Sequence, residues 1–167
     1  MNEIFVVTHG DKTNGPNPRM TPKGFEEIAS LRHLLPVKIP VLVVGTGGRH
    51  LDVATALNYN EIRRYSSVVG DPDSMEVIDG EKIVILSDGT HINIALYTSL
   101  ADNSVSAKRF ITGLADKTVV CSGRPFMIAL GINGKSAAVY RILCNDGEIR
   151  QIDQMIAYGV FDPALQM

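Results

Sequence analysis

The chain lacks the features that mark several common classes of protein. No uninterrupted apolar run in its 167 residues reaches the roughly 18 residues that a membrane-spanning helix needs. Its 16 Lys and Arg are outnumbered by 18 Asp and Glu, so it has no basic excess of the kind that nucleic-acid-binding proteins carry. We therefore expect neither a membrane nor a nucleic acid among its partners, and nothing in the sequence fixes an oligomeric state.

Cysteine is scarce too. Cys121 and Cys144 lie far apart, each in a strand-like apolar stretch. That spacing is unlike the spacing of zinc ligands, and a buried reduced pair is typical of a cytoplasmic protein. The first ten residues include Glu3 and no basic segment, which indicates a first strand and not a signal peptide. We expect a cytoplasmic protein without a metal.

What the sequence does have is an alternation of short β-branched runs and helix-like segments. The runs are at residues 4–7, 41–44, 83–86, 118–121 and 137–143. The first of them shows little polar alternation, as expected of a strand covered on both faces. Helices are expected at residues 21–35, 49–57, 104–115 and 125–130. This rhythm predicts one domain, residues 1–167, of the three-layer α/β/α class with a mostly parallel sheet.

Two stretches depart from that rhythm and predict hairpins. Asp88-Gly89 stands between two apolar runs, and Asn145-Asp146-Gly147 precedes another. Asp-Gly pairs favour the tight turns that join antiparallel strands.

Polar residues gather where three of the expected strands end. The first run leads into Thr8-His9-Gly10 and Lys12, the second into residues 45–48 and Arg49, and the fourth into Ser122 and Arg124. In an open α/β sheet, ligands bind at the carboxyl ends of the strands. The helices that begin there favour an anion, because their N-termini carry free N–H groups and partial positive charge.

These residues resemble the motifs of the histidine phosphatase (phosphoglycerate mutase-like) superfamily. The first strand of that family ends in Arg-His-Gly, and a Leu-Thr-Pro-x-Gly segment begins its first helix; here the chain has Thr8-His9-Gly10 and Met20-Thr21-Pro22-Lys23-Gly24. The family's second strand leads through Ser-Pro-x-x-Arg, which Arg49 matches. The resemblance implies a phosphoglycerate mutase-like fold, with His9 as the residue that accepts the phosphoryl group.

The sequence departs from the family at two positions around the phosphate. Thr8 stands in place of an arginine, and Ser122 stands in place of the second histidine in the family's Val-Val-x-His-Gly strand end. Loss of one comparable electrostatic donor costs roughly 3–4 kcal/mol in an enzyme. We therefore expect a pseudoenzyme that binds phosphate or a phosphorylated small molecule with weak or no hydrolysis. Its catalytic position is His9, and the expected ligand contacts are Thr8, Gly10, Lys12, Arg49, Ser122 and Arg124.

Other interpretations stay open. The chain is either an active phosphomonoesterase (a phosphoric monoester hydrolase), in which Arg124 or Lys12 replaces the lost charge, or a non-catalytic structural or interaction domain. His50 fits a surface position at a helix start, and Arg49 alternatively pairs with Asp52 or Glu61. No general acid is assigned among Asp71, Asp73 and Glu76.

The glycine-rich residues 45–48 also have a second interpretation. A dinucleotide-binding turn would need a further glycine at position 50, where the sequence has His50. We expect an anion-binding turn and no cofactor.

Overall fold

The fold is seen in a computed structural model, which describes residues 1–14, 18–37, 40–44, 47–65, 72–86, 91–93, 101–132, 135–147 and 150–160. Its elements in order are β1 (Asn2–Thr8), α1 (Pro22–Ala29), η1 (Arg32–Leu34), β2 (Val41–Val44), α2 (Gly48–Ala56), β3 (Ile62–Tyr65), β4 (Pro72–Ile78), β5 (Glu81–Leu86), β6 (His91–Asn93), α4 (Ala101–Thr112), β7 (Thr118–Ser122), α5 (Arg124–Ala129), β8 (Ala138–Cys144) and β9 (Ile152–Val160).

The main sheet has six strands in the order β3-β2-β7-β1-β8-β9. The pairs β2–β3, β2–β7 and β1–β7 are parallel, whereas β8 runs antiparallel to β1 and β9 antiparallel to β8. The expectation of a mostly parallel sheet is thus confirmed. Because β7 lies between β2 and β1, with Thr8 opposite Ser122, the carboxyl ends of these three strands are neighbours.

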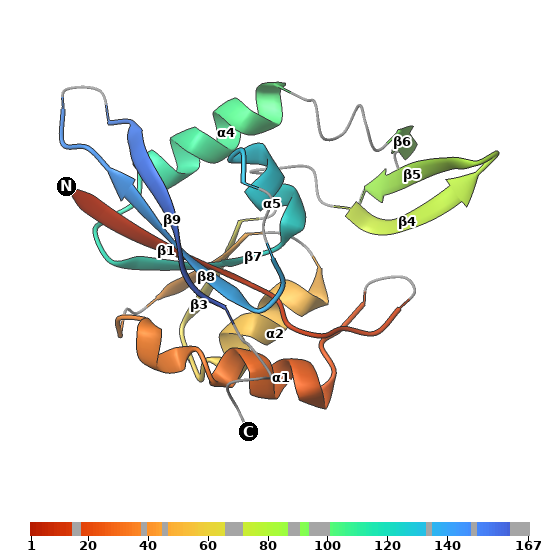
Figure 1. Cartoon of the computed structure of the whole chain (residues 1–167), viewed down its shortest axis with the longest axis horizontal. Coiled ribbons are helices and arrows are strands. Elements are labelled where there is room, and N and C mark those ends of the chain that lie inside the picture. Colours follow the sequence, from red (N-terminus) through yellow and green to blue (C-terminus); the bar gives the residue numbers. More distant parts are fainter. Residues whose placement is uncertain are drawn as a thin grey trace.

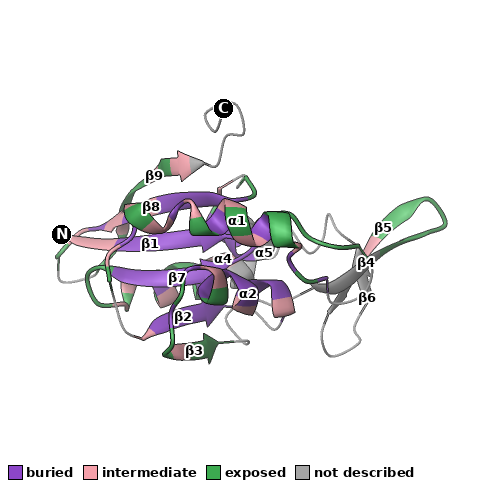
Figure 2. Cartoon of the chain, turned by 90° about the horizontal axis from the view of Figure 1, so that it is seen from below, coloured by how far each residue is buried: buried purple, intermediate pink, exposed green. Residues whose placement is uncertain are grey.

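Helices cover both faces of this sheet (Figure 1). On one face α1 and α2 pack over a core that includes Val7, Ile28, Val43 and Leu57. On the other face α4 and α5 pack over a second core, of which Val6 is a member. Figure 2 shows the buried strands between these layers. The three-layer α/β/α prediction is confirmed.

Helix α1 begins as expected and ends earlier. Thr21 Oγ1 accepts a hydrogen bond of 3.1 Å from Gly24 N, and Pro22 occupies the first helical position. The helix ends at Ala29 and not near residue 35, because Ser30 donates to Glu27 O at 2.6 Å and the chain tightens into η1. Ile28 is buried on the inner face, as are Leu31 and Leu35 beyond the helix end.

Strands β4, β5 and β6 form a separate antiparallel sheet that lies toward the carboxyl ends of β1, β2 and β7 in both views (Figures 1 and 2). The turn between β4 and β5 was not predicted. Asp79 and Gly80 both have positive φ, 51° and 80°, as a type I′ hairpin turn requires. The predicted turn at Asp88-Gly89 lies outside the described residues; the strands on either side of it, β5 and β6, pair antiparallel, with Ile85 opposite His91.

The last two strands, β8 and β9, form the second expected hairpin, closed by a 3.0 Å bond from Asn145 N to Gln151 O. Cys121 and Cys144 are both free and buried, and burial raises the pKa of Cys121 to about 12. None of the helices in the described part of the chain is long and apolar enough to cross a membrane.

Candidate anion site at the strand ends

The site begins with a close contact between two glycines. A β-carbon on Gly10 would lie 2.6 Å from Gly24 O, and one on Gly24 would lie 2.2 Å from Asp11 O. The first turn of α1 therefore packs directly on the backbone that follows β1. The two motifs that carry the family resemblance, His-Gly and Thr-Pro-x-Gly, are thus the two sides of one backbone contact that sets the position of His9.

His9 follows β1 and is half-buried, with Nδ1 2.9 Å from Gly10 O. A carbonyl oxygen only accepts hydrogen bonds, so Nδ1 carries the proton and Nε2 keeps a lone pair. Burial lowers the pKa of His9; the Gly10 bond opposes this, and the charges of Arg49 and Lys12 lower the pKa further. At neutral pH the ring is therefore uncharged, with Nε2 as an acceptor or nucleophile.

Arg49 lies in the first turn of α2 and is only 7% exposed. Gly47 precedes the helix in extended conformation, without a side-chain cap, and a β-carbon there would meet Arg49 Nη1 at 2.7 Å. The guanidinium thus lies against the start of its own helix, where an anion also benefits from free N–H groups. Gly45 and Thr46 of the glycine-rich turn lie outside the described residues.

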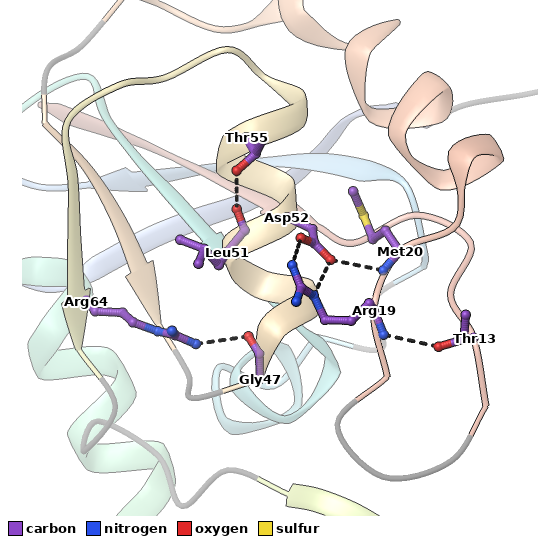
Figure 3. Close-up of polar contacts among 8 residues, drawn as sticks. All are labelled: Thr13, Arg19, Met20, Gly47, Leu51, Asp52, Thr55 and Arg64. Atoms are coloured by element: carbon purple, nitrogen blue, oxygen red, sulfur yellow. Dashed lines mark hydrogen bonds and ion pairs between the residues drawn. The ribbon is translucent and has the colours of Figure 1, made fainter.

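A second arginine, which the sequence reasoning missed, also contacts this turn. Arg64 of β3 donates from Nη2 to Gly47 O at 3.0 Å (Figure 3). Both Arg64 and its neighbour Arg63 are exposed. The side chain of Arg63 lies on the other side of the strand, because successive residues of a strand alternate in direction. The parallel pairing of β2 and β3 would have been needed to foresee this contact, because Arg64 and Gly47 are far apart in the sequence.

Thr8 and Ser122 lie opposite each other in the register but differ in their bonding. Thr8 Oγ1 donates to Lys135 O at 2.6 Å and accepts from Ala138 N at 3.1 Å, so its single hydrogen is used within the fold. Ser122 is 1% exposed, and its hydroxyl meets no hydrogen-bond partner among the described residues.

His50 is the largest surprise of the site. The expectation of a surface position is wrong, since the residue is 1% exposed. Its ring centroid lies 6.4 Å from that of His9, and a β-carbon on Gly123 would meet its Nε2 at 2.4 Å. The sequence offered one signal for the burial of His50. Gly47 and Gly123 are both small and leave space for its ring beside the end of β7.

Asp52, one of the two alternative partners considered for Arg49, forms an ion pair with Arg19. Arg19 Nε and Nη2 donate to the carboxylate at 2.8 and 2.5 Å, and Met20 N adds a third bond at 3.1 Å (Figure 3). A β-carbon on Gly48 would meet Arg19 Cδ at 2.4 Å, so the arginine also lies against the α2 backbone. These contacts tie the loop after β1 to α2.

Replacing Asp52 with Asn should destabilise the protein by about 1–2 kcal/mol at pH 7, measured by urea unfolding. Burial acts to raise the pKa of Asp52, but the Arg19 and Met20 hydrogen bonds and the Arg19 charge outweigh it, so the pKa is lowered. The carboxylate therefore adds stability above the unfolded pKa of about 3.9, and this contribution is lost as pH falls through the lower folded pKa.

The control is Asp146→Asn, which removes an exposed ion pair with the chain's amino terminus and should change stability little. The difference between wild type and Asp52→Asn should shrink over the acid interval below about pH 4. A difference that stays constant over that interval would contradict the role given to the ion pair.

The remaining predicted positions are less informative. Lys12 is exposed, and its backbone pairs with that of Met20 in an isolated antiparallel β-bridge. Its positive charge lowers the pKa of His9. Arg124 begins α5, but its side chain lies outside the described residues, as do Asp71 and the side chain of Asp73. Glu76 is exposed on β4. No group of three or more potential metal ligands occurs in the described ranges.

No family model and no curated protein sequence matches the chain. Solved structures do. TTHB049 from Thermus thermophilus is similar with a TM-score of 0.57 and 14% identity, over 93% of this chain and 99% of that one. Rv3214 from Mycobacterium tuberculosis has a TM-score of 0.56 and 14% identity, over 92% and 96%.

A third similar structure is a phosphoserine phosphatase from Entamoeba histolytica, solved with 3-phosphoglyceric acid. Its TM-score is 0.57 at 12% identity, over 95% of this chain and 98% of that one. The likeness spans nearly the whole length of each protein, so it concerns the complete fold and not a shared fragment. This chain therefore has the fold of these three proteins, one of which is a phosphatase.

Proposed function

We propose that this protein binds inorganic phosphate or a phosphorylated small molecule at the carboxyl ends of β1, β2 and β7, and hydrolyses it weakly or not at all. The observation that carries the proposal is a buried arginine, Arg49 in the first turn of α2, close enough to the half-buried His9 for its charge to lower the pKa of that ring. The likeness to a phosphoserine phosphatase supports the same ligand class.

The charges at the site suit a phosphoryl group. Arg49 offers a planar fork of N–H donors, the geometry that binds phosphate oxygens in pairs. The free N–H groups of the first turn of α2 add partial positive charge. Lys12 brings a further cation close to His9. A dianion placed between these groups would be stabilised more than a neutral ligand of the same size.

We expect weak turnover because uncharged residues, Thr8 and Ser122, stand at two positions where the resembling family has an arginine and a histidine. A transferring phosphoryl group is stabilised mainly by positioned cations around its oxygens. Thr8 carries no charge and donates its hydrogen to Lys135 O, and Ser122 carries no charge either. With Arg49 as the buried cation described at these strand ends, affinity is retained more readily than rate.

One observation favours the active alternative, a phosphomonoesterase that uses His9 as phosphoacceptor. The bond to Gly10 O holds the proton on Nδ1, and the lowered pKa keeps the ring neutral, so Nε2 has the lone pair that a nucleophile needs. The two functions share a ligand and differ in turnover.

Thermal unfolding and phosphate release test the proposal together. Inorganic phosphate should raise the melting temperature of the wild type, since a ligand at 100 times its Kd adds about 2.7 kcal/mol of stability. His9→Gln should reduce that rise, whereas His33→Gln, on the exposed surface of η1, should not.

An aryl phosphate such as p-nitrophenyl phosphate separates the two functions. Release of p-nitrophenol at no more than the His9→Gln background supports the proposal, and release that His9→Gln abolishes supports the phosphomonoesterase. If phosphate leaves the melting temperature unchanged, both fail and a structural or interaction domain is favoured.

A further inference from the structure

Three buried side-chain atoms in the described part of the chain have no hydrogen-bond partner there: His50 Nδ1, His50 Nε2 and Ser122 Oγ. His50 lies in the first turn of α2, and Ser122 is the last residue of β7. Buried polar groups are nearly always paired in folded proteins, and an unpaired one destabilises the fold. A cluster of them in one place therefore needs an explanation that packing alone does not supply.

The His50 ring is held tightly on three sides. It extends from the first turn of α2, with Cε1 3.5 Å from the position of a β-carbon on Gly47. On the β7 side, a β-carbon on Gly123 would lie 2.4 Å from Nε2 and 3.2 Å from Cδ2. The third side faces His9, with ring centroids 6.4 Å apart and planes inclined at 34°. The ring is thus between the start of α2, the end of β7 and the proposed phosphoacceptor.

The ring is also uncharged at neutral pH. Burial lowers the pKa of His50 well below its ordinary value, and the charges of Arg49 and Arg64, together with that of His9 when it is protonated, lower it further. A neutral imidazole has one donor and one acceptor nitrogen in either tautomer. His9, with its proton on Nδ1, adds a second acceptor at Nε2. The site therefore combines donors from Arg49 and His50 with two imidazole acceptors.

We infer that His50 is a ligand-contacting residue of this site, and that the site selects a phosphoryl group carrying a proton over a fully deprotonated tetrahedral anion. Arg49 and the N–H of His50 bind the charged oxygens, and the lone pair of His9 Nε2 accepts from a P–OH group. Gly123 leaves room for this ring, since a side chain there would displace it. This inference rests on the proposed function and adds to it the ligand's protonation state.

Sulfate is the matched probe for that claim. It has the shape of phosphate and is a dianion at pH 7, but it carries no proton, whereas inorganic phosphate at that pH carries one or two. A site built to hydrogen-bond a ligand's hydroxyl discriminates strongly against an analogue that lacks it, because buried groups are left unpaired. We expect inorganic phosphate to bind at least about tenfold more tightly than sulfate in isothermal titration calorimetry.

Two substitutions test the role of His50 with the same two probes. His50→Leu removes both ring nitrogens and keeps a side chain of similar volume. It should weaken phosphate binding by about tenfold or more and reduce the preference for phosphate over sulfate. Gly123→Ala should do the same by displacing the ring. Their controls are His33→Leu, on the surface, and Gly113→Ala, where a β-carbon meets its nearest atom at 3.3 Å.

The outcomes separate this inference from the proposed function. If the wild type binds phosphate and His50→Leu binds it equally well, His50 is no ligand contact and the inference fails while the function stands. Equal affinity for phosphate and sulfate overturns the claim about the proton. If the wild type binds neither anion, the proposed function itself fails.

A measurement on the unaltered protein guards against misfolding of the variants. The ring nitrogens of His50 should shift in nitrogen NMR spectra as inorganic phosphate is added, following the same saturation curve as the calorimetric titration. The ring of His33 serves as the internal reference and should not shift. Saturable phosphate binding without any change at His50 would overturn the inference.

Discussion

Arg49→Gln should weaken the binding of inorganic phosphate by about 100-fold. Arg49 is the buried cation at the start of α2, and hydrogen bonds to charged partners contribute about 1.5–3 kcal/mol each. Losing one or two of them, at about 1.4 kcal/mol per tenfold, gives a change of that size. Isothermal titration calorimetry with inorganic phosphate at fixed ionic strength measures it.

Two further variants make this result specific. Arg49→Lys keeps the charge but loses the planar fork, so it should retain part of the affinity. Arg63→Gln removes an exposed arginine on the neighbouring strand β3 and should change the affinity less than about twofold. If Arg63→Gln weakens binding as much as Arg49→Gln does, the anion is held by diffuse charge and not by the strand-end site.

Much of the site's framework is predictable because motif and topology agree. His9 follows a buried run of β-branched residues, and parallel strands bring their carboxyl ends to one edge of a sheet. The glycines at 10 and 24 are explained by a single contact, in which neither backbone leaves room for a β-carbon. Arg49 lies at this edge for the same reason, since it is in the first turn of the helix that follows the parallel strand β2.

The misses have different physical causes. His50 was expected on the surface because it begins a helix, but whether a first-turn side chain is buried depends on the neighbouring strand end, here Gly123 of the turn after β7. The pairing of Asp52 with Arg19, from the loop after β1, likewise depends on how that loop folds back. Both contacts join segments that the sequence separates widely, and no local pattern encodes them.

The strand periodicity of β1 explains the position of the Thr8 side chain. In a strand, residues two apart share a face, and Ile4 and Val6 face the α4–α5 layer. Thr8 continues that series, and its hydroxyl bonds to Lys135 O and Ala138 N across the sheet. Its polarity is thus explained by the fold. The weak turnover that we propose is consistent with this role, because the Thr8 hydroxyl bonds β1 to β8.

Gly24→Ala should destabilise the protein by about 3 kcal/mol and lower its melting temperature by roughly 6–12 °C. A β-carbon at this position would lie 2.2 Å from Asp11 O and 3.0 Å from Asp11 N. These are backbone atoms, and they are fixed by a 2.9 Å bond from Thr21 N to Asp11 O and a 2.8 Å bond from Asp11 N to Glu27. No side chain is available to move aside, so α1 or the chain after β1 must shift.

The matched control for this effect is Gly113→Ala. Alanine favours a helix interior over glycine by about 1 kcal/mol, which works against the loss at Gly24. Gly113 directly follows the last residue of α4 and is not among the glycines with positive φ, so alanine is free of backbone strain there. At Gly113 the nearest atom to a β-carbon is Arg109 O, at 3.3 Å, so the control should change stability by less than about 1 kcal/mol.

Because His9 lies next to the displaced contact, Gly24→Ala should also weaken phosphate binding in whatever fraction stays folded. The substitution touches no atom of the proposed ligand, so such a loss reports on the positions of His9 and Gly10, which follow β1. A variant as stable as the control would show that the chain after β1 yields without cost. The backbone contact would then no longer explain why the His-Gly and Thr-Pro-x-Gly motifs occur together.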